Sequence, residues 1–143
     1  MARLAARAGT DTAAVTVPIK VARHGNATLE LVPVTINGRS PFVFMLDTGS
    51  SVSSVSRRLA ARLRLRSSGG TTQIRVVVTS PQVPLAAIGA WTLGTAALAP
   101  ETVAVLPLAK TGGGSVAGLL GSDELRRFGS ITADFSRQQL RLA

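Results

Sequence analysis

Cysteine and tyrosine are absent from the 143 residues of this chain, and histidine occurs once. Without cysteine the chain can hold no thiol nucleophile, disulfide, zinc finger or iron–sulfur site, and cysteine usage says nothing of the redox compartment. A single histidine also excludes an imidazole metal cluster. This histidine, His24, precedes Gly25 and Asn26, a turn sequence that predicts a solvated side chain instead of a member of a Ser-His-Asp triad.

Long apolar runs are also missing. No run approaches the roughly 18 to 20 apolar residues that a membrane-spanning helix needs, and the basic, alanine-rich residues 1–12 lead into no apolar core of a signal peptide. We expect a flexible basic arm over residues 1–13 and one domain over residues 14–143. The localisation stays open: cytoplasmic by default, or the soluble part of a membrane-anchored or envelope protein.

Acidic residues are few, and the formal net charge is +9. A basic balance allows nucleic acid, anionic membranes or acidic proteins as partners. However, aromatic residues make up only 3%, which leaves a single-strand binder without stacking platforms, so we expect no nucleic-acid partner. Five arginines fall in one short stretch, where a solvated helix face is expected: Arg57, Arg58, Arg62, Arg64 and Arg66.

Most of the chain has the alternating pattern of short strands. Asn37-Gly38 predicts a hairpin turn, because both positions tolerate positive φ. The fully apolar residues 41–46 predict a strand that is buried on both faces. Ser67-Ser68-Gly69-Gly70 predicts a loop. Strands are expected at residues 14–22, 28–36, 41–46, 71–78, 83–93, 102–108, 116–120, 131–135 and 139–142.

Two short helices are expected between these strands. Ser56 is a suitable N-cap for a helix over residues 57–65, with Leu59 and Leu63 facing the core. Ser122 would cap a second helix, with Asp123 and Glu124 in the first turn, where the helix dipole favours acids. Many short strands with two short helices predict an all-β fold, either a small closed barrel or a sandwich.

Acid–base chemistry in this chain would fall to carboxylates. Asp47 ends the apolar run and is followed at once by Thr48, Gly49 and Ser50. An aspartate at the end of an apolar strand is costly if it is merely structural, although the triplet alone is also compatible with an Asx turn. About seventy residues later a second apolar strand ends in Gly121 and opens directly into a helix.

The other carboxylates have ordinary structural explanations. Glu30 falls on the polar face of its strand, Glu101 in a turn, and Asp134 in the terminal hairpin, where an arginine can pair with it. Asp11-Thr12 repeats part of the motif but lacks the glycine and the preceding apolar strand. We predict a catalytic role for none of them.

The two motifs in this order resemble those of retropepsin-like single-domain aspartic proteases of the bacterial type, over residues 15–142. The resemblance implies an all-β fold, a small closed β-barrel of the retropepsin or acid protease type, with one or two short helices. It implies that Asp47 is catalytic, that Thr48 interlocks with its partner across a dimer axis, that Gly49 lines the cleft floor, and that Ser50 places a hydroxyl near the carboxylate.

The resemblance also implies a flap that closes over the substrate. It would be the hairpin over residues 71–93, and its tip departs from the family pattern because it has neither tyrosine nor a run of glycines. The residues expected at the flap and substrate cleft are Val78, Thr79, Ser80, Pro81 and Gln82.

Peptide hydrolysis by carboxylates needs two of them sharing a proton, and this chain has one Asp-Thr-Gly. We therefore expect a homodimeric aspartic endopeptidase that acts on a peptide or protein without metal or cofactor. Strands from the chain ends, such as residues 139–142, could add an intersubunit sheet. Two alternatives stay open. The flap departures allow a catalytically silent dimeric β module for peptide binding or oligomerisation, and the net charge allows a basic nucleic-acid-binding barrel.

Overall fold

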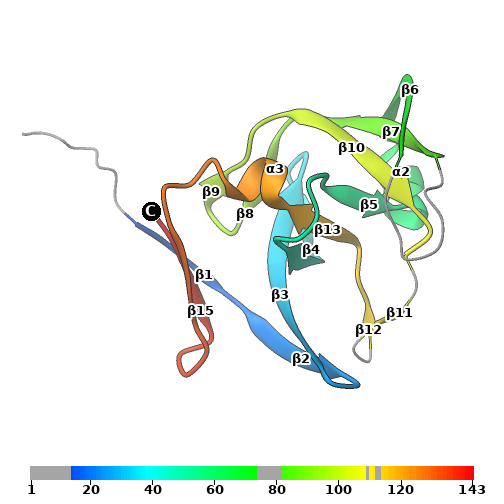
Figure 1. Cartoon of the computed structure of the whole chain (residues 1–143). Coiled ribbons are helices and arrows are strands. Elements are labelled where there is room, and N and C mark those ends of the chain that lie inside the picture. The colour runs from blue at the N-terminus through cyan, green and yellow to red at the C-terminus, as the bar shows by residue number, and fades with distance from the viewer. Residues whose placement is uncertain (1–13, 74–81, 109, 112–113) are drawn as a thin grey trace, which may run out of the picture.

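The computed structural model describes residues 14–73, 82–108, 110–111 and 114–143 (Figure 1). The predicted arm over residues 1–13 lies outside this part. In chain order the elements are β1 (Val15–Pro18), β2 (Lys20–His24), β3 (Ala27–Ile36), β4 (Arg39–Asp47), β5 (Ser54–Ser56), α2 (Arg57–Leu63), β6 (Arg66–Gln73), β7 (Gln82–Ile88), β8 (Trp91–Leu93), β9 (Ala96–Ala97), β10 (Glu101–Leu106), β11 (Lys110–Thr111), β12 (Gly114–Ser115), β13 (Gly118–Gly121), α3 (Ser122–Leu125), β14 (Ile131–Asp134) and β15 (Gln139–Leu142).

The strands form one large sheet and two small ones. The large sheet has the order β6-β7-β10-β5-β13-β4-β3-β8-β9, with β2 also paired to β3, while β1-β15-β14 and β11-β12 form separate sheets. The all-β prediction is confirmed, but no sheet of the described residues closes, so the predicted closed barrel is wrong. Closure needs end strands that can pair along their length. Here β9 has two residues, and the strands near the chain ends pair with one another instead.

The small terminal sheet packs on the same core as the large one. In β1 and β15 the apolar side chains alternate inward, so that Val17, Leu140 and Leu142 are buried while Arg141 is exposed. The rings of Phe44 and Trp91 meet edge to face in this core, with centroids 6.4 Å apart. Figure 1 shows β1 and β15 on one side of the molecule and α2, β6 and β7 on the other.

Strand β4, which carries the apolar run, is not buried on both faces as predicted. Phe44 is completely buried, but Val43, which points to the opposite face, is 46% exposed. That face is not covered at Val43, because the sheet has its hydrophobic core on the Phe44 side. The apolar pattern therefore predicted the strand correctly, but the prediction that both of its faces are buried is wrong.

Several local signals formed as predicted. Asn37 and Gly38 both have positive φ, 53° and 71°, in the β3–β4 turn, and β14 and β15 form the terminal hairpin. The predicted loop at residues 67–70 is wrong, because β6 runs through it. Its pairing with β7 satisfies the backbone across a register shift between Ser67 and Thr71, where an irregular, glycine-containing stretch is tolerated.

Helix α2 begins as predicted, and the Ser56 hydroxyl accepts a hydrogen bond from Leu59 N at 3.0 Å. The helix ends at Leu63, two residues early, since Arg64 takes the left-handed conformation that terminates it. Leu59 is buried in the core, whereas Arg57, Arg58 and Arg62 lie exposed, as expected of a solvated face. In the described part of the chain no helix is long and apolar enough to span a membrane.

Candidate active site

Asp47 is the last residue of β4, and β13 brings the second motif beside it. The two strands are parallel, with Leu120 opposite Leu46 and Gly121 opposite Asp47. Because parallel strands end at the same edge of a sheet, the loop after β4 and the start of α3 share one place in the molecule. The two motifs, about seventy residues apart in the sequence, are thus brought together.

The glycines of β13 permit this close approach. A Cβ on Gly118 would lie 2.4 Å from the Phe44 ring and 2.5 Å from the Ser54 carbonyl oxygen, and one on Gly121 would lie 2.7 Å from the Ser50 carbonyl oxygen. A side chain at either position would push β13 away from β4 or from the loop. This is the physical reason for glycine at both ends of the apolar strand.

Hydrogen bonds fold the loop after Asp47 tightly. Ser50 N donates to the Asp47 carbonyl at 3.1 Å, and the Ser50 carbonyl accepts from Ser122 N at 2.8 Å and from Ser122 Oγ at 3.1 Å. Gly121, not Ser122, is the N-cap of α3, so the predicted cap is wrong: the serine hydroxyl binds the loop instead of the helix end.

The Ser50 hydroxyl donates to the Val52 carbonyl at 2.8 Å and accepts from Val52 N at 3.3 Å, so its hydrogen bonds shape the loop. Its expected place near the carboxylate stays a prediction. Asp47 is half-buried, while Thr48 and Gly49 are exposed. Gly49 lies against the carboxylate, since a Cβ there would be 3.5 Å from Asp47 Oδ1.

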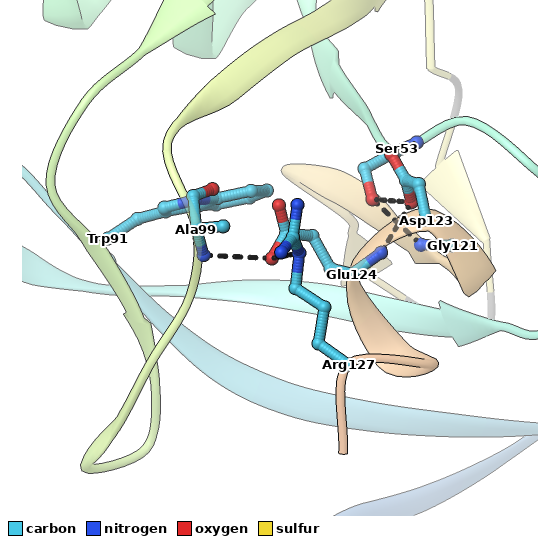
Figure 2. A network of polar contacts seen from close by, with 7 residues as sticks. All are labelled: Ser53, Trp91, Ala99, Gly121, Asp123, Glu124 and Arg127. Atoms are coloured by element: carbon cyan, nitrogen blue, oxygen red, sulfur yellow. Dashed lines mark hydrogen bonds and ion pairs between the residues drawn. The ribbon is translucent and has the colours of Figure 1, made fainter. Parts of the chain in front are cut away.

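A buried polar network holds the far end of the loop (Figure 2). Asp123 Oδ2 accepts from Ser53 N at 2.9 Å, and Asp123 Oδ1 accepts from Ser53 Oγ at 2.7 Å and from Glu124 N at 3.0 Å. The Ser53 hydroxyl oxygen also accepts from Gly121 N at 2.9 Å. Asp123 therefore ties the loop to β13 and α3.

Glu124 anchors the other side of α3. Its side chain is completely buried; Oε1 accepts from Ala99 N at 2.9 Å and lies 3.6 Å from Arg127 Nε. Trp91 Nε1 donates to the Ala99 carbonyl at 2.7 Å, which joins the core to the network (Figure 2). From the sequence, Asp123 and Glu124 were explained by the helix dipole alone, and these contacts were not predicted. Two adjacent acids one residue beyond Gly121, in a chain with few carboxylates, were the available signal.

Glu101, expected in a turn, begins β10 beside these two carboxylates. Burial raises the pKa of Glu101 to about 10, helped by its neighbours Glu124 and Asp123. Burial also raises the pKa of Asp123, but hydrogen bonds from Glu101 and Ser53 together outweigh burial and leave that pKa below its ordinary value. At neutral pH Glu101 is thus protonated and Asp123 ionised.

The remaining site predictions fall partly outside the described residues. Val78, Thr79, Ser80 and Pro81 of the predicted flap tip lie there, whereas Gln82 is the exposed first residue of β7. The β6–β7 hairpin that would carry this tip is present, with Gln73 opposite Gln82. Among the described residues no group of three or more histidine, cysteine, aspartate or glutamate side chains could hold a metal ion.

The comparisons with known proteins agree with this arrangement. The model of the aspartyl protease family matches residues 32–123, which include both Asp47 and Gly121. The chain therefore belongs to the aspartyl protease family. No curated protein matches the sequence.

A solved structure has the same fold. It is a retropepsin-like aspartic protease from Rickettsia conorii, 17% identical, with a TM-score of 0.55, and the match covers 92% of this chain and 94% of that one. The retroviral protease-like domain of Ddi1 from Leishmania major is also similar: it is 18% identical, with a TM-score of 0.48, over 82% of this chain and 95% of that one.

Proposed function

We propose that this chain is an aspartic endopeptidase in which two Asp47 carboxylates, one from each subunit of a homodimer, activate water for peptide hydrolysis. The observation that carries the proposal is the placement of Asp47 at the end of β4, opposite Gly121 of β13 and beside Gly49. Family membership supports the same activity.

The mechanism needs two carboxylates in different states. One takes a proton from water while the other gives a proton to the carbonyl oxygen of the peptide bond, and the pair shares one proton because like charges so close cannot both ionise. Asp47 is the one carboxylate of this chain that belongs to an Asp-Thr-Gly motif. A second subunit, related to the first by a two-fold axis between the two active loops, would supply the second carboxylate.

Thr48 is exposed beside Asp47, where it can meet its counterpart across that axis. The expectation that β15 adds to an intersubunit sheet is wrong, because β15 is already paired on both edges, with β1 and with β14. In the described part of the chain β1 and β14 each pair on one edge. The outer edge of β1 is thus one that a second subunit could extend.

Cleavage of a peptide library by the wild type and Asp47→Asn tests the function. We expect the wild type to cleave and Asp47→Asn to lose all turnover while keeping its fold, because an amide cannot act as the general base. Asp134→Asn, on the exposed terminal hairpin, is the control and should cleave normally.

Equal turnover by the wild type and Asp47→Asn would refute the protease. Peptide binding by both proteins without cleavage would instead favour the silent β module. Salt-dependent binding of DNA or RNA, unaffected by Asp47→Asn, would favour the nucleic-acid-binding alternative, for which the exposed arginines of α2 supply the charge.

A further inference from the structure

The loop that carries Asp47 is fixed at both ends. At its start, Asp47 is held by the pairing of β4 with β13. At its far end, Ser53 is completely buried, and both its backbone N and its hydroxyl donate to the Asp123 carboxylate, at 2.9 and 2.7 Å. Since water has no access to Ser53, water cannot replace a hydrogen bond that is lost when Asp123 is changed.

We propose that Asp123 is a positioning residue for hydrolysis: its carboxylate fixes Ser53, and with it the loop that presents Asp47 to the substrate. This role rests on the proposed protease function. The contact from Gly121 N to the Ser53 hydroxyl strengthens it, because Gly121 is the register partner of Asp47. The network thus links the far end of the loop back to its start.

The neighbouring carboxyl groups of Glu101, Asp123 and Glu124 indicate which of the three carries a proton. Glu101 stands beside Asp123 and Glu124, and the Oε2 atoms of Glu101 and Glu124 are buried without a hydrogen-bond partner in the described residues. Arg127, itself 57% exposed, is a weak counter-ion for such a cluster. A proton on Glu101 supplies the missing donor and leaves Asp123 ionised, able to accept from Ser53.

This arrangement makes the position of the loop depend on pH. Protonation of Asp123 would place a hydrogen where Ser53 now donates, so a contact is lost and the end of the loop is released. The titratable and charged groups that face Asp123 are Glu101 from β10 and Glu124 from α3, with Arg127 behind Glu124. The loop itself presents the uncharged Ser53.

The test compares Asp123→Asn and Ser53→Ala with a matched pair of controls, all in the full chain. In the control pair, Ser136 Oγ donates to Asp134 Oδ1 at 2.8 Å and Arg137 N to the same oxygen at 3.1 Å. As at Asp123, a carboxylate accepts from a serine hydroxyl and from a backbone N, but here the contacts are exposed in the terminal hairpin. Asp134→Asn and Ser136→Ala should therefore leave activity unchanged.

We expect kcat of Asp123→Asn to fall about 100-fold while KM changes less than about threefold, because a misplaced reacting group weakens the chemical step. Ser53→Ala keeps its backbone contact and should lose about tenfold. The ratio of wild-type to Asp123→Asn kcat should shrink as the pH falls through the titration of Asp123, since the protonated wild type has lost the same contact. A ratio independent of pH, or a folded Asp123→Asn with wild-type kcat, would overturn the proposal.

Hydrogen exchange of the amides of residues 50–53 separates this proposal from the protease assignment. These amides should exchange about tenfold faster in Asp123→Asn and Ser53→Ala, and at the wild-type rate in the controls. Unchanged exchange would refute the positioning role even if the wild type cleaves peptides. Faster exchange would support the fixing of the loop by Asp123 even if the wild type proves inactive. If Asp123→Asn does not fold, the exchange of Ser53→Ala decides.

Discussion

Single residues at the contact of β4 and β13 decide how closely the two motifs approach. Gly118 has no room for a side chain, since its Cβ would meet both the Phe44 ring and the backbone of Ser54. Gly89, by contrast, has no atom of the described residues within 4 Å of where its Cβ would lie, and its backbone is not left-handed. A substitution at Gly89 is therefore a suitable control for the same substitution at Gly118.

We predict that Gly118→Ala lowers the free energy of unfolding by about 1 to 3 kcal/mol or more, because overpacking forces β13 away from β4. Gly89→Ala should change it by less than about 0.5 kcal/mol. Urea denaturation of both variants measures the difference. Equal stability of the two variants would contradict the close contact between β13 and Phe44.

Glu101 is a second single residue with a marked effect: it makes the stability of the fold depend on pH. Its folded pKa is raised to about 10 from an ordinary value of 4.5, mainly by burial. Such a group contributes fully below its unfolded pKa, and its contribution is lost as the pH rises toward the folded value. Between these values the unfolded chain is ionised there while the folded chain keeps the proton.

We therefore predict that Glu101→Gln, which is neutral at every pH and can still donate to the neighbouring carboxylates, gains on the wild type as the pH rises. The Tm of the variant minus that of the wild type should increase from pH 5 to pH 8 in thermal unfolding followed by circular dichroism. A difference that stays constant or decreases would contradict a protonated Glu101.

At the scale of elements, β5 contains two buried serines, beside the start of α2, whose hydroxyl groups have opposite effects on stability. The Ser56 hydroxyl accepts from Leu59 N and caps α2. The Ser54 hydroxyl is buried two residues earlier with no hydrogen-bond partner in the described part of the chain. A capping hydroxyl stabilises the helix start, whereas an unpaired buried hydroxyl has lost its hydration without compensation.

We predict that Ser56→Ala destabilises the fold by about 1 kcal/mol, the usual contribution of an N-cap. Ser54→Ala should be neutral or stabilising, since it removes an unsatisfied polar group. Chemical denaturation of both single variants provides the comparison. If Ser54→Ala were the more destabilising of the two, the hydroxyl of Ser54 would have a partner.

At the scale of the whole molecule, the site is half of what the proposed chemistry needs. Each chain contributes one Asp47, with Thr48 exposed beside it and the outer edge of β1 unpaired in the described residues. A second copy would supply the missing carboxylate and could extend the terminal sheet. The proposed activity would then be a property of the dimer.

We predict that specific activity falls on dilution through the dimer dissociation constant, and that excess Asp47→Asn chains inhibit the wild type by forming heterodimers with one Asp47. Thr48→Ala should weaken association more than it disturbs the monomer. Sedimentation and activity are measured over the same concentration range. Excess Asp134→Asn chains, which keep Asp47 and should not inhibit, are the mixing control. A monomer with constant specific activity at every dilution would refute the dimer.

Local signals in the sequence determined much of the fold. The Asn37-Gly38 turn, the Ser56 cap and the β14–β15 hairpin all formed as predicted, because each depends on the conformational preferences of a few neighbouring residues. The order of the two motifs, Asp47 after one apolar strand and Gly121 after another, was enough to indicate the family. The three local predictions needed only residue type and short spacing, whereas the family was indicated by a resemblance in two motifs about seventy residues apart.

Only the tertiary structure decided which strands pair and what surrounds each carboxylate. The open sheet, the exposure of Val43 and the course of β6 depend on contacts between residues far apart in the sequence. Glu101 and Asp123 lie on different elements, so no local pattern could reveal that one holds a proton and the other accepts from Ser53. Burial and hydrogen bonding set the charge of these groups, and both arise only when the chain has folded.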